Sequence, residues 1–145
     1  MTRARAARVR FYMDADVLGA ARVLAGLRPD VTYPGDAGGG VHRRRRPACP
    51  IEPGAPDTEW IPRVADAGWR IITRDNRIQH HRAEIAAVRD NGARMVALTG
   101  DDARSTWTQL EVLFTQWRRI EPLAETPGPF IWALTRTARR EVPLV

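Results

Sequence analysis

Three aspartates follow apolar segments that are typical of buried strands. Asp14 and Asp16 come directly after the run 9–13, and Asp75 lies two residues beyond the run 69–73. An apolar strand has little reason to end on a carboxylate, so these acids need another explanation. Ligands of an open α/β sheet bind outside the carboxyl ends of its strands. If the two strands are neighbours, Asp14 and Asp75 point into one crevice.

Further acids follow the same rule less directly. Asp57 and Glu59 lie in DTEWIP, near the start of an expected helix, and they approach the same side of the predicted sheet. They are two residues apart and do not share a helix face, so we favour Asp57 as the functional residue and hold Glu59 in reserve. Asp101 and Asp102 follow a later strand, and they either cap the long helix behind them or assist at the crevice.

Clustered carboxylates raise one another's pKa unless a cation offsets their charge. Mg²⁺ and Mn²⁺ prefer oxygen ligands, and either ion would allow an anionic phosphodiester to approach. A bound ion can activate a water and stabilise the leaving oxygen of an in-line displacement. We therefore expect a catalytic metal site at this edge of the sheet. Its candidate residues are Asp14, Asp57 and Asp75, with Asp16, Glu59 or Asp102 assisting.

Purely structural roles stay open for several of these residues. Asp16 has the position of a helix N-cap, and Asp75 with Asn76 could form a turn after its strand. His80 and His81 are adjacent rather than four residues apart, so a shared zinc ion is not expected. They either begin a helix or face a substrate.

The bulk composition suits a single domain. The chain has 145 residues, of which 43% are hydrophobic, and that is enough for a core. No apolar run is long enough to cross a membrane, and no apolar segment follows the basic N-terminus as it would in a secretory signal. Cys49 is the only cysteine, which excludes internal disulfides and thiolate zinc clusters. We expect a cytoplasmic protein.

The formal net charge is +6, and all 23 basic residues are arginine. This bias reflects either a GC-rich genome or a polyanionic partner. The lack of lysine excludes the phosphate loop of P-loop NTPases. FYMDAD followed by a helix resembles the first motif of haloacid-dehalogenase-type phosphatases, but those enzymes, like phosphoacceptor receiver domains, need a lysine on the phosphoryl oxygens. A phosphatase is therefore a weaker alternative.

Strands and helices alternate along the chain. Continuous apolar runs predict strands at 9–13, 31–33, 69–73, 94–98 and 130–134. Helical spacing predicts helices between them, and the longest follows Asp101 and Asp102. This order predicts an α/β fold, three-layer α/β/α with a mostly parallel central sheet. The longest helix carries Trp107, Leu110, Phe114 and Trp117 at helical spacing, and we interpret this stripe as core.

Residues 34–56 break this pattern. The segment contains five glycines and five prolines, which predicts a flexible loop. It also contains four consecutive arginines, which are either a solvated charge run or a phosphate-binding arm. They are Arg43, Arg44, Arg45 and Arg46.

The segments RFYMDAD, DTEWIPRVADAGWRIITRD and MVALTG together resemble the PIN-like nuclease domains, and more narrowly the branch related to VapC-type toxins of toxin–antitoxin modules. The resemblance implies the strand order 3-2-1-4-5, a cluster of acids that holds Mg²⁺ or Mn²⁺, and hydrolysis of RNA phosphodiesters. On this resemblance Asp14, Asp57 and Asp75 match the family's acids. A fourth acid is matched only approximately, by Asp101 or Asp102.

The sequence thus predicts one PIN-like domain over residues 1–145 that acts as a metal-dependent endoribonuclease. Its expected partners are RNA and, following the resemblance, an antitoxin protein and a second copy of the chain. Arg74, Arg77 and the four consecutive arginines are the candidates for holding the RNA backbone. The strand and tail at 130–145 could dock, swap or bind a partner. The main rival is a catalytically silent module that binds nucleic acid or an acidic protein.

Overall fold

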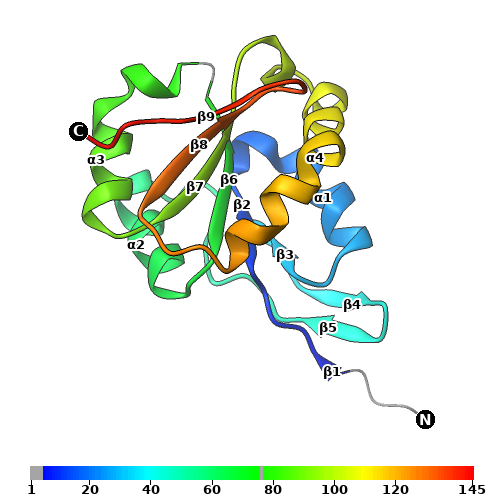
Figure 1. Ribbon diagram of the computed structural model, residues 1–145. Coiled ribbons are helices and arrows are strands. Elements are labelled where there is room, and N and C mark those ends of the chain that lie inside the picture. Colours follow the sequence, from blue (N-terminus) through cyan, green and yellow to red (C-terminus); the bar gives the residue numbers. More distant parts are fainter. Residues whose placement is uncertain (1–4, 76) are drawn as a thin grey trace.

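A computed structural model of the chain describes residues 5–75 and 77–145. Its main sheet has the strand order β3-β2-β6-β7-β8-β9 (Figure 1). Neighbouring strands run parallel except for the last, which is antiparallel to β8. The strands are β2 (Phe11–Met13), β3 (Val31–Thr32), β6 (Arg70–Arg74), β7 (Arg94–Leu98), β8 (Phe130–Leu134) and β9 (Arg139–Glu141).

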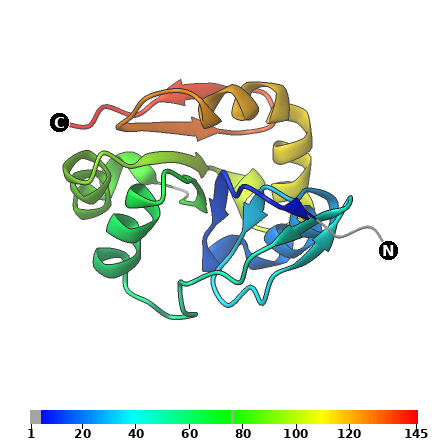
Figure 2. The same cartoon turned by 90° about the horizontal axis from the view of Figure 1, so that it is seen from below.

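Helices cover both faces of this sheet (Figure 2). The first face carries α1 (Leu18–Leu27) and α4 (Thr106–Ile120), and the second carries α2 (Asp57–Asp66) and α3 (Arg82–Asp90). The predicted α/β/α architecture is therefore confirmed. Short 3-10 helices join these elements, namely η1 (Ala15–Val17), η2 (Ile78–His80), η3 (Asp101–Ala103) and η4 (Glu121–Ala124).

Each face of the sheet has its own hydrophobic core. Phe11 packs with Leu113 on the α1/α4 side, whereas the next residue, Tyr12, packs with Ile61 on the α2/α3 side. Successive strand residues point to opposite faces, so a strand covered on both faces must be apolar at every position. This explains why the central strands appear in the sequence as continuous apolar runs.

The strand order implied by the family resemblance is wrong in detail. Among the described residues, the five parallel strands are arranged 2-1-3-4-5 in chain order, because the third, β6, pairs directly with the first, β2. The order 3-2-1-4-5 would need another parallel strand beyond β3. The chain after β3 instead enters a hairpin in a separate small sheet, so β3 remains the edge.

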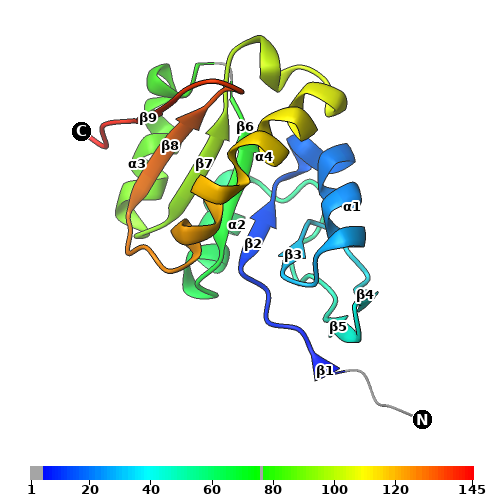
Figure 3. The same ribbon diagram turned by 45° about the vertical axis from the view of Figure 1, so that its right-hand side comes forward.

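Residues 34–56 contain regular structure rather than loop alone. β4 (Gly39–Val41) and β5 (Arg44–Arg46) form an antiparallel hairpin, and β1 (Arg5–Ala6) pairs with β5 in parallel. The two turn residues between β4 and β5 have φ angles of 48° and 63°, as a tight hairpin turn requires. This small sheet lies beyond the amino end of β2, at the opposite end of that strand from η1 (Figure 3).

The stripe predicted on the longest helix is core only at Leu110 and Trp117, which pack against the α1/α4 core, and this corrects the sequence interpretation for its other two residues. Trp107 is 74% exposed and Phe114 is 57% exposed. The buried face of α4 is rotated around the helix axis relative to that stripe and includes Gln109 and Gln116. Their side-chain amides donate to backbone carbonyls at 2.8 and 2.9 Å. Those hydrogen bonds allow polar residues to occupy the core-facing positions, and for this reason the aromatic spacing misled.

The C-terminal tail docks on its own domain. β9 pairs with β8, and Val142, which follows it, is buried. No helix within residues 5–75 and 77–145 combines the length and the apolar character that a membrane span requires.

Candidate metal-dependent active site

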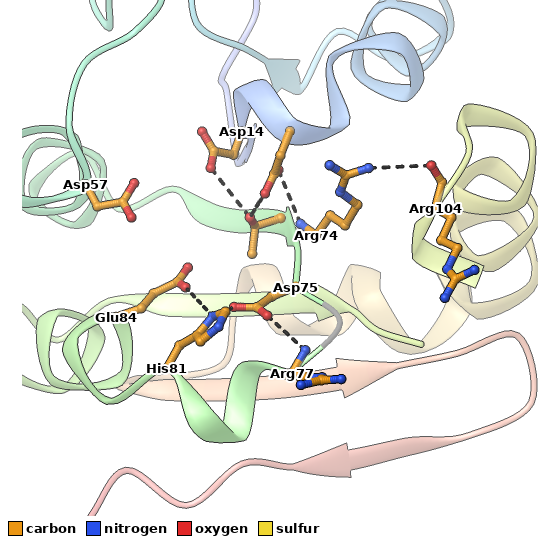
Figure 4. A pocket seen from close by; sticks show the side chains of 10 residues that line it. Asp14, Asp57, Arg74, Asp75, Arg77, His81, Glu84 and Arg104 are labelled. Atoms are coloured by element: carbon orange, nitrogen blue, oxygen red, sulfur yellow. Dashed lines mark hydrogen bonds and ion pairs between the residues drawn. The ribbon is translucent and has the colours of Figure 1, made fainter. Parts of the chain in front are cut away.

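The carboxyl ends of β2 and β6 lie side by side, because the two strands are neighbours in the sheet. An open cavity of about 750 Å³ lies at this edge (Figure 4). Its acidic side chains come from strand ends and from the first turns of helices on both sides. Together with one imidazole they are Asp14, Asp16, Asp57, Asp75, His81 and Glu84.

Asp14 and Asp16 are held by the turn that ends β2. Asp14 is the N-cap of η1, and its Oδ1 accepts a hydrogen bond from the Ala15 N–H at 2.7 Å. Asp16 accepts a hydrogen bond from the Thr73 hydroxyl at 2.9 Å and one from the Arg74 N–H at 3.3 Å. The capping role left open for Asp16 therefore belongs to Asp14. Both carboxylates remain at the cavity.

Asp57 reaches the cavity as the first residue of α2. Its Oδ1 accepts a hydrogen bond from the Trp60 Nε1–H at 2.9 Å. The Trp60 side chain is buried, and its ring centroid lies 5.1 Å from that of Tyr12 on β2. The core thus fixes the direction of this carboxylate.

Asp75 is buried directly after β6 and lies beside His81 and Glu84. Its Oδ1 accepts a hydrogen bond from the Arg77 N–H at 2.9 Å, and its Oδ2 is hydrogen-bonded to Nδ1 of His81. Oε2 of Glu84, in the first turn of α3, lies 4.0 Å from the same nitrogen. Candidate ligand atoms of Asp75, His81 and Glu84 all lie within 4.8 Å of one another.

Burial and neighbouring carboxylates together disfavour ionisation of three acids at this cavity. Burial, followed by the nearby Asp14 carboxylate, raises the pKa of Asp16 to about 7. Burial, followed by Asp75, raises the pKa of Glu84 to about 8. Burial also raises the pKa of Asp14, and Asp57 adds to this effect. Nearby positive groups do not compensate these carboxylates fully.

Two candidate acids lie elsewhere. Glu59 is exposed on α2 and does not line the cavity. Asp102 instead accepts hydrogen bonds from the backbone N–H and from Nε of Arg136, at 2.9 and 3.2 Å, and so ties η3 to the turn after β8. It does not cap the long helix either, because Ser105 is the N-cap of α4.

The candidate arginines divide into two groups. Arg74 and Arg77 line the acidic cavity. The four consecutive arginines lie on the hairpin at the far end of β2, so they do not belong to this cavity (Figures 1 and 3). Arg46 is also buried and ion-paired with Asp36, which corrects its assignment as a backbone-binding residue. Arg43, Arg44 and Arg45 remain exposed or nearly so.

Sequence reasoning missed three residues at the cavity. Glu84 was not among the candidate residues, although its spacing of three residues from His81 would let both side chains share a site. Thr73 donates to Asp16, which its strand-end position did not indicate. Arg104 lines the cavity from the end of η3, and nothing in its neighbourhood in the sequence predicted this.

The donor set fits a divalent cation. Carboxylate oxygens are the ligands that Mg²⁺ and Mn²⁺ prefer, and the raised pKa values show charge that such an ion would offset. The imidazole of His81 is either a further donor or the group that orients Asp75. Among the described residues, Asp75, His81 and Glu84 form the group whose candidate ligand atoms lie closest together, and Asp14, Asp16 and Asp57 line the same cavity.

Comparison with known proteins agrees with this geometry. A family model described as a PIN-like domain matches residues 10–100, more than half of the chain, and the match contains the acidic residues of the cavity. No curated protein and no solved structure matched the chain. PIN domains are generally nucleases and typically use divalent metals. The chain belongs to the PIN-like domain family.

Proposed function

We propose that this protein is a metal-dependent endoribonuclease that uses Mg²⁺ or Mn²⁺. The observation that carries the proposal is the convergence of Asp14, Asp57, Asp75 and Glu84 at the carboxyl edge of a PIN-like fold. Structural acids normally have a basic partner, whereas two acids beside this cavity have a pKa of about 7 or 8. Such a cluster is expected where an ion and a phosphodiester bind together.

The residues of the chain divide the work by position. Asp14, Asp57, Asp75 and Glu84 would hold the ion, and a bound ion would supply charge neutralisation and activation of water. His81 orients Asp75 through its Nδ1 hydrogen bond.

The arginines at the cavity hold the substrate. Arg74 and Arg77 line the cavity, as does Arg104, and their guanidinium groups would contact the phosphates on either side of the scissile bond. Arg43, Arg44 and Arg45 are too far along the molecule to act there, and they would contact only a longer RNA (Figure 1).

A role as the toxin of a toxin–antitoxin module is a narrower proposal. It rests on the resemblance of RFYMDAD and DTEWIP to the VapC-related branch. An antitoxin partner and a homodimer belong to the same proposal. Expression of the protein should arrest growth of a bacterial host, and Asp75→Asn should relieve the arrest. Equal growth with both forms would contradict the toxin role and leave the nuclease proposal standing.

The phosphatase alternative gains no support. The chain has no lysine. Thr99, the strand-end threonine that such a phosphatase would use, donates from its hydroxyl to the Leu134 carbonyl at 3.3 Å and does not line the cavity. The silent binding module predicts that divalent ions do not bind at the acidic edge.

The experiment that tests the proposal is cleavage of a mixed RNA pool by purified protein with Mn²⁺ or Mg²⁺, repeated in EDTA. Asp75→Asn removes a central acid, and Glu59→Gln is the matched control because it removes an exposed carboxylate outside the cavity. Metal-dependent cleavage by wild type and Glu59→Gln, but not by Asp75→Asn, is expected. Cleavage that persists in EDTA or in Asp75→Asn would overturn the proposal.

A further inference from the structure

A second concentration of charge lies at the opposite edge of the main sheet. Arg10 directly precedes β2, and Arg70 and Arg94 are the first residues of the neighbouring strands β6 and β7. The Arg70 N–H donates to the Arg10 carbonyl at 2.8 Å, and the register of β6 on β7 sets Arg70 level with Arg94. With Arg8 these arginines line a pocket of about 240 Å³, and Glu125 is the one acid among its described lining residues.

Arg70 is buried at the centre of this group. Its three guanidinium nitrogens donate to the carbonyls of Leu123, Gly68 and Thr126, at 2.6, 2.6 and 3.0 Å. Carbonyl dipoles offset only part of a full charge, and no carboxylate in the described part of the chain forms an ion pair with Arg70. Burial lowers the pKa of this guanidinium, and the neighbouring arginines lower it further.

The other arginines of the pocket differ in whether they form ion pairs with carboxylates. Arg10 has carboxylate partners in Asp30, Glu121 and the pocket's own Glu125, at 3.0, 3.3 and 3.8 Å. Arg94 has a buried Nε with no hydrogen-bond partner among residues 5–75 and 77–145. Within the same ranges neither Arg94 nor Arg8 forms an ion pair. A buried donor without an acceptor is costly, and among the described residues that line this pocket four arginines face a single glutamate.

We propose that this arginine pocket, formed by Arg8, Arg10, Arg70 and Arg94, binds a phosphate group. Guanidinium groups donate to phosphate oxygens in pairs, and a phosphate dianion would supply negative charge where Glu125 is the one acid among the described lining residues. The pocket volume of about 240 Å³ is several times the ~30 Å³ that one water occupies, so a phosphate and its ester oxygen have room.

This binding site is separate from the proposed nuclease site. The arginine pocket lies at the amino ends of β2, β6 and β7, and the acidic cavity lies at the carboxyl ends of β2 and β6. The phosphate group could belong to a free phosphorylated molecule or to a nucleic acid chain, since both present the same oxygens. The acidic cavity is not required for either, so the test is made in EDTA.

The first measurement is titration with inorganic phosphate at constant ionic strength, followed by calorimetry and by thermal unfolding. Arg94→Gln removes the unpartnered guanidinium, and Arg118→Gln is the matched control because it removes an exposed charge on α4. Phosphate should bind and stabilise the wild type and Arg118→Gln. Binding should weaken at least about tenfold in Arg94→Gln, as expected for loss of a charged hydrogen-bond donor.

A second variant guards against misfolding, because the Arg94 stem packs closely against Gly128. Arg8→Gln changes an exposed side chain at the rim and should also weaken phosphate binding. The proposal is overturned if phosphate acts no differently from chloride at equal ionic strength. It is equally overturned if both variants bind phosphate as the wild type does.

A second experiment asks which kind of molecule supplies the phosphate group. It compares short RNA oligomers that carry a 5′-phosphate with oligomers that lack one. A preference for the 5′-phosphate that disappears in Arg94→Gln supports the proposal and assigns a terminal or free phosphate. Equal weakening of both oligomers in Arg94→Gln supports it and assigns a backbone phosphate. Unchanged binding of both oligomers, with unchanged binding of inorganic phosphate, rejects the site.

Discussion

The two edges of the central sheet both concentrate like charges, yet they tolerate that charge by different means. At the carboxyl edge, the pKa of Asp16 is about 7 and that of Glu84 about 8, so these acids can hold a proton near neutral pH. At the amino edge the charged groups are arginines, whose guanidinium groups as a class keep their charge in proteins. Arg70 is instead surrounded by carbonyl oxygens.

This difference determines what each edge responds to. The charge of the acidic edge changes with pH and would be offset by cations, which suits a site that must accept both a metal ion and an anionic substrate. The charge of the basic edge is constant, and only anions can offset it. The predictions that follow test this contrast in order of expected size.

The largest effect is expected at the acidic edge. Asp14→Asn should lower the rate of RNA cleavage at least about a hundredfold, since even residues behind metal ligands cost up to that factor. Asp102→Asn is the control, because Asp102 pairs with Arg136 outside the cavity. Its cleavage rate should match that of the wild type. Equal losses in both variants, measured at saturating Mn²⁺, would show that the cavity has no special role.

At the basic edge, the effect should fall on stability. Arg70→Met leaves three backbone carbonyls without their donor and should lower the free energy of unfolding by about 2 kcal/mol. Urea unfolding measures this, with Arg118→Gln as the control. The loss should be the same below and above neutral pH, because arginine does not titrate there. A stability equal to that of the wild type would contradict the described contacts.

The stability of the metal-free protein should depend on pH through the acidic edge. Asp16 and Glu84 have ordinary pKa values of 3.8 and 4.5 and folded values of about 7 and 8, so between these limits the native state binds more protons than the unfolded state. The free energy of unfolding therefore falls as pH rises through this window.

Glu84→Gln removes one of these two groups and should flatten that dependence, as should added Mg²⁺ in the wild type. Urea unfolding across the window gives the slope, in EDTA for the metal-free proteins and without EDTA for the wild type with Mg²⁺. A wild-type stability that rises with pH would contradict the assigned charges.

The smallest effect is expected when a single arginine that contacts the RNA phosphate backbone is replaced. Arg74→Gln at the cavity should lower the salt dependence of RNA binding by about one unit of slope. Arg44→Gln, on the distant hairpin, should change the binding of a short RNA less. A reversed order would place the RNA path along the hairpin, and fluorescence titrations at several salt concentrations decide between the two.

The fold was largely predictable from the sequence because its strands are buried on both faces. The strands at 94–98 and 130–134 were predicted with their observed limits. The hairpin of β4 and β5 was not predicted, because a glycine-rich and arginine-rich segment carries no apolar signal. Trp107 and Phe114 were misassigned, since helical spacing identifies one face of a helix but not whether that face is covered.

The site was predictable only where local position determines it. Asp14 and Asp75 end their strands, and that alone brings them together in a parallel sheet. Glu84 enters through the packing of α3, and Asp102 is engaged by Arg136, which lies 34 residues further along the chain. Such long-range pairings leave no mark in a single sequence.

The most direct test of the central claim is calorimetric titration of the wild type, Asp75→Asn and Glu59→Gln with Mn²⁺ at a pH above about 8, the pKa of Glu84, where both Asp16 and Glu84 are more than half ionised. If the carboxyl edge is a metal site, the wild type and Glu59→Gln bind Mn²⁺ with equal affinity, and Asp75→Asn binds at least about tenfold more weakly. Absence of binding to the wild type, or equal binding to all three proteins, would contradict the account.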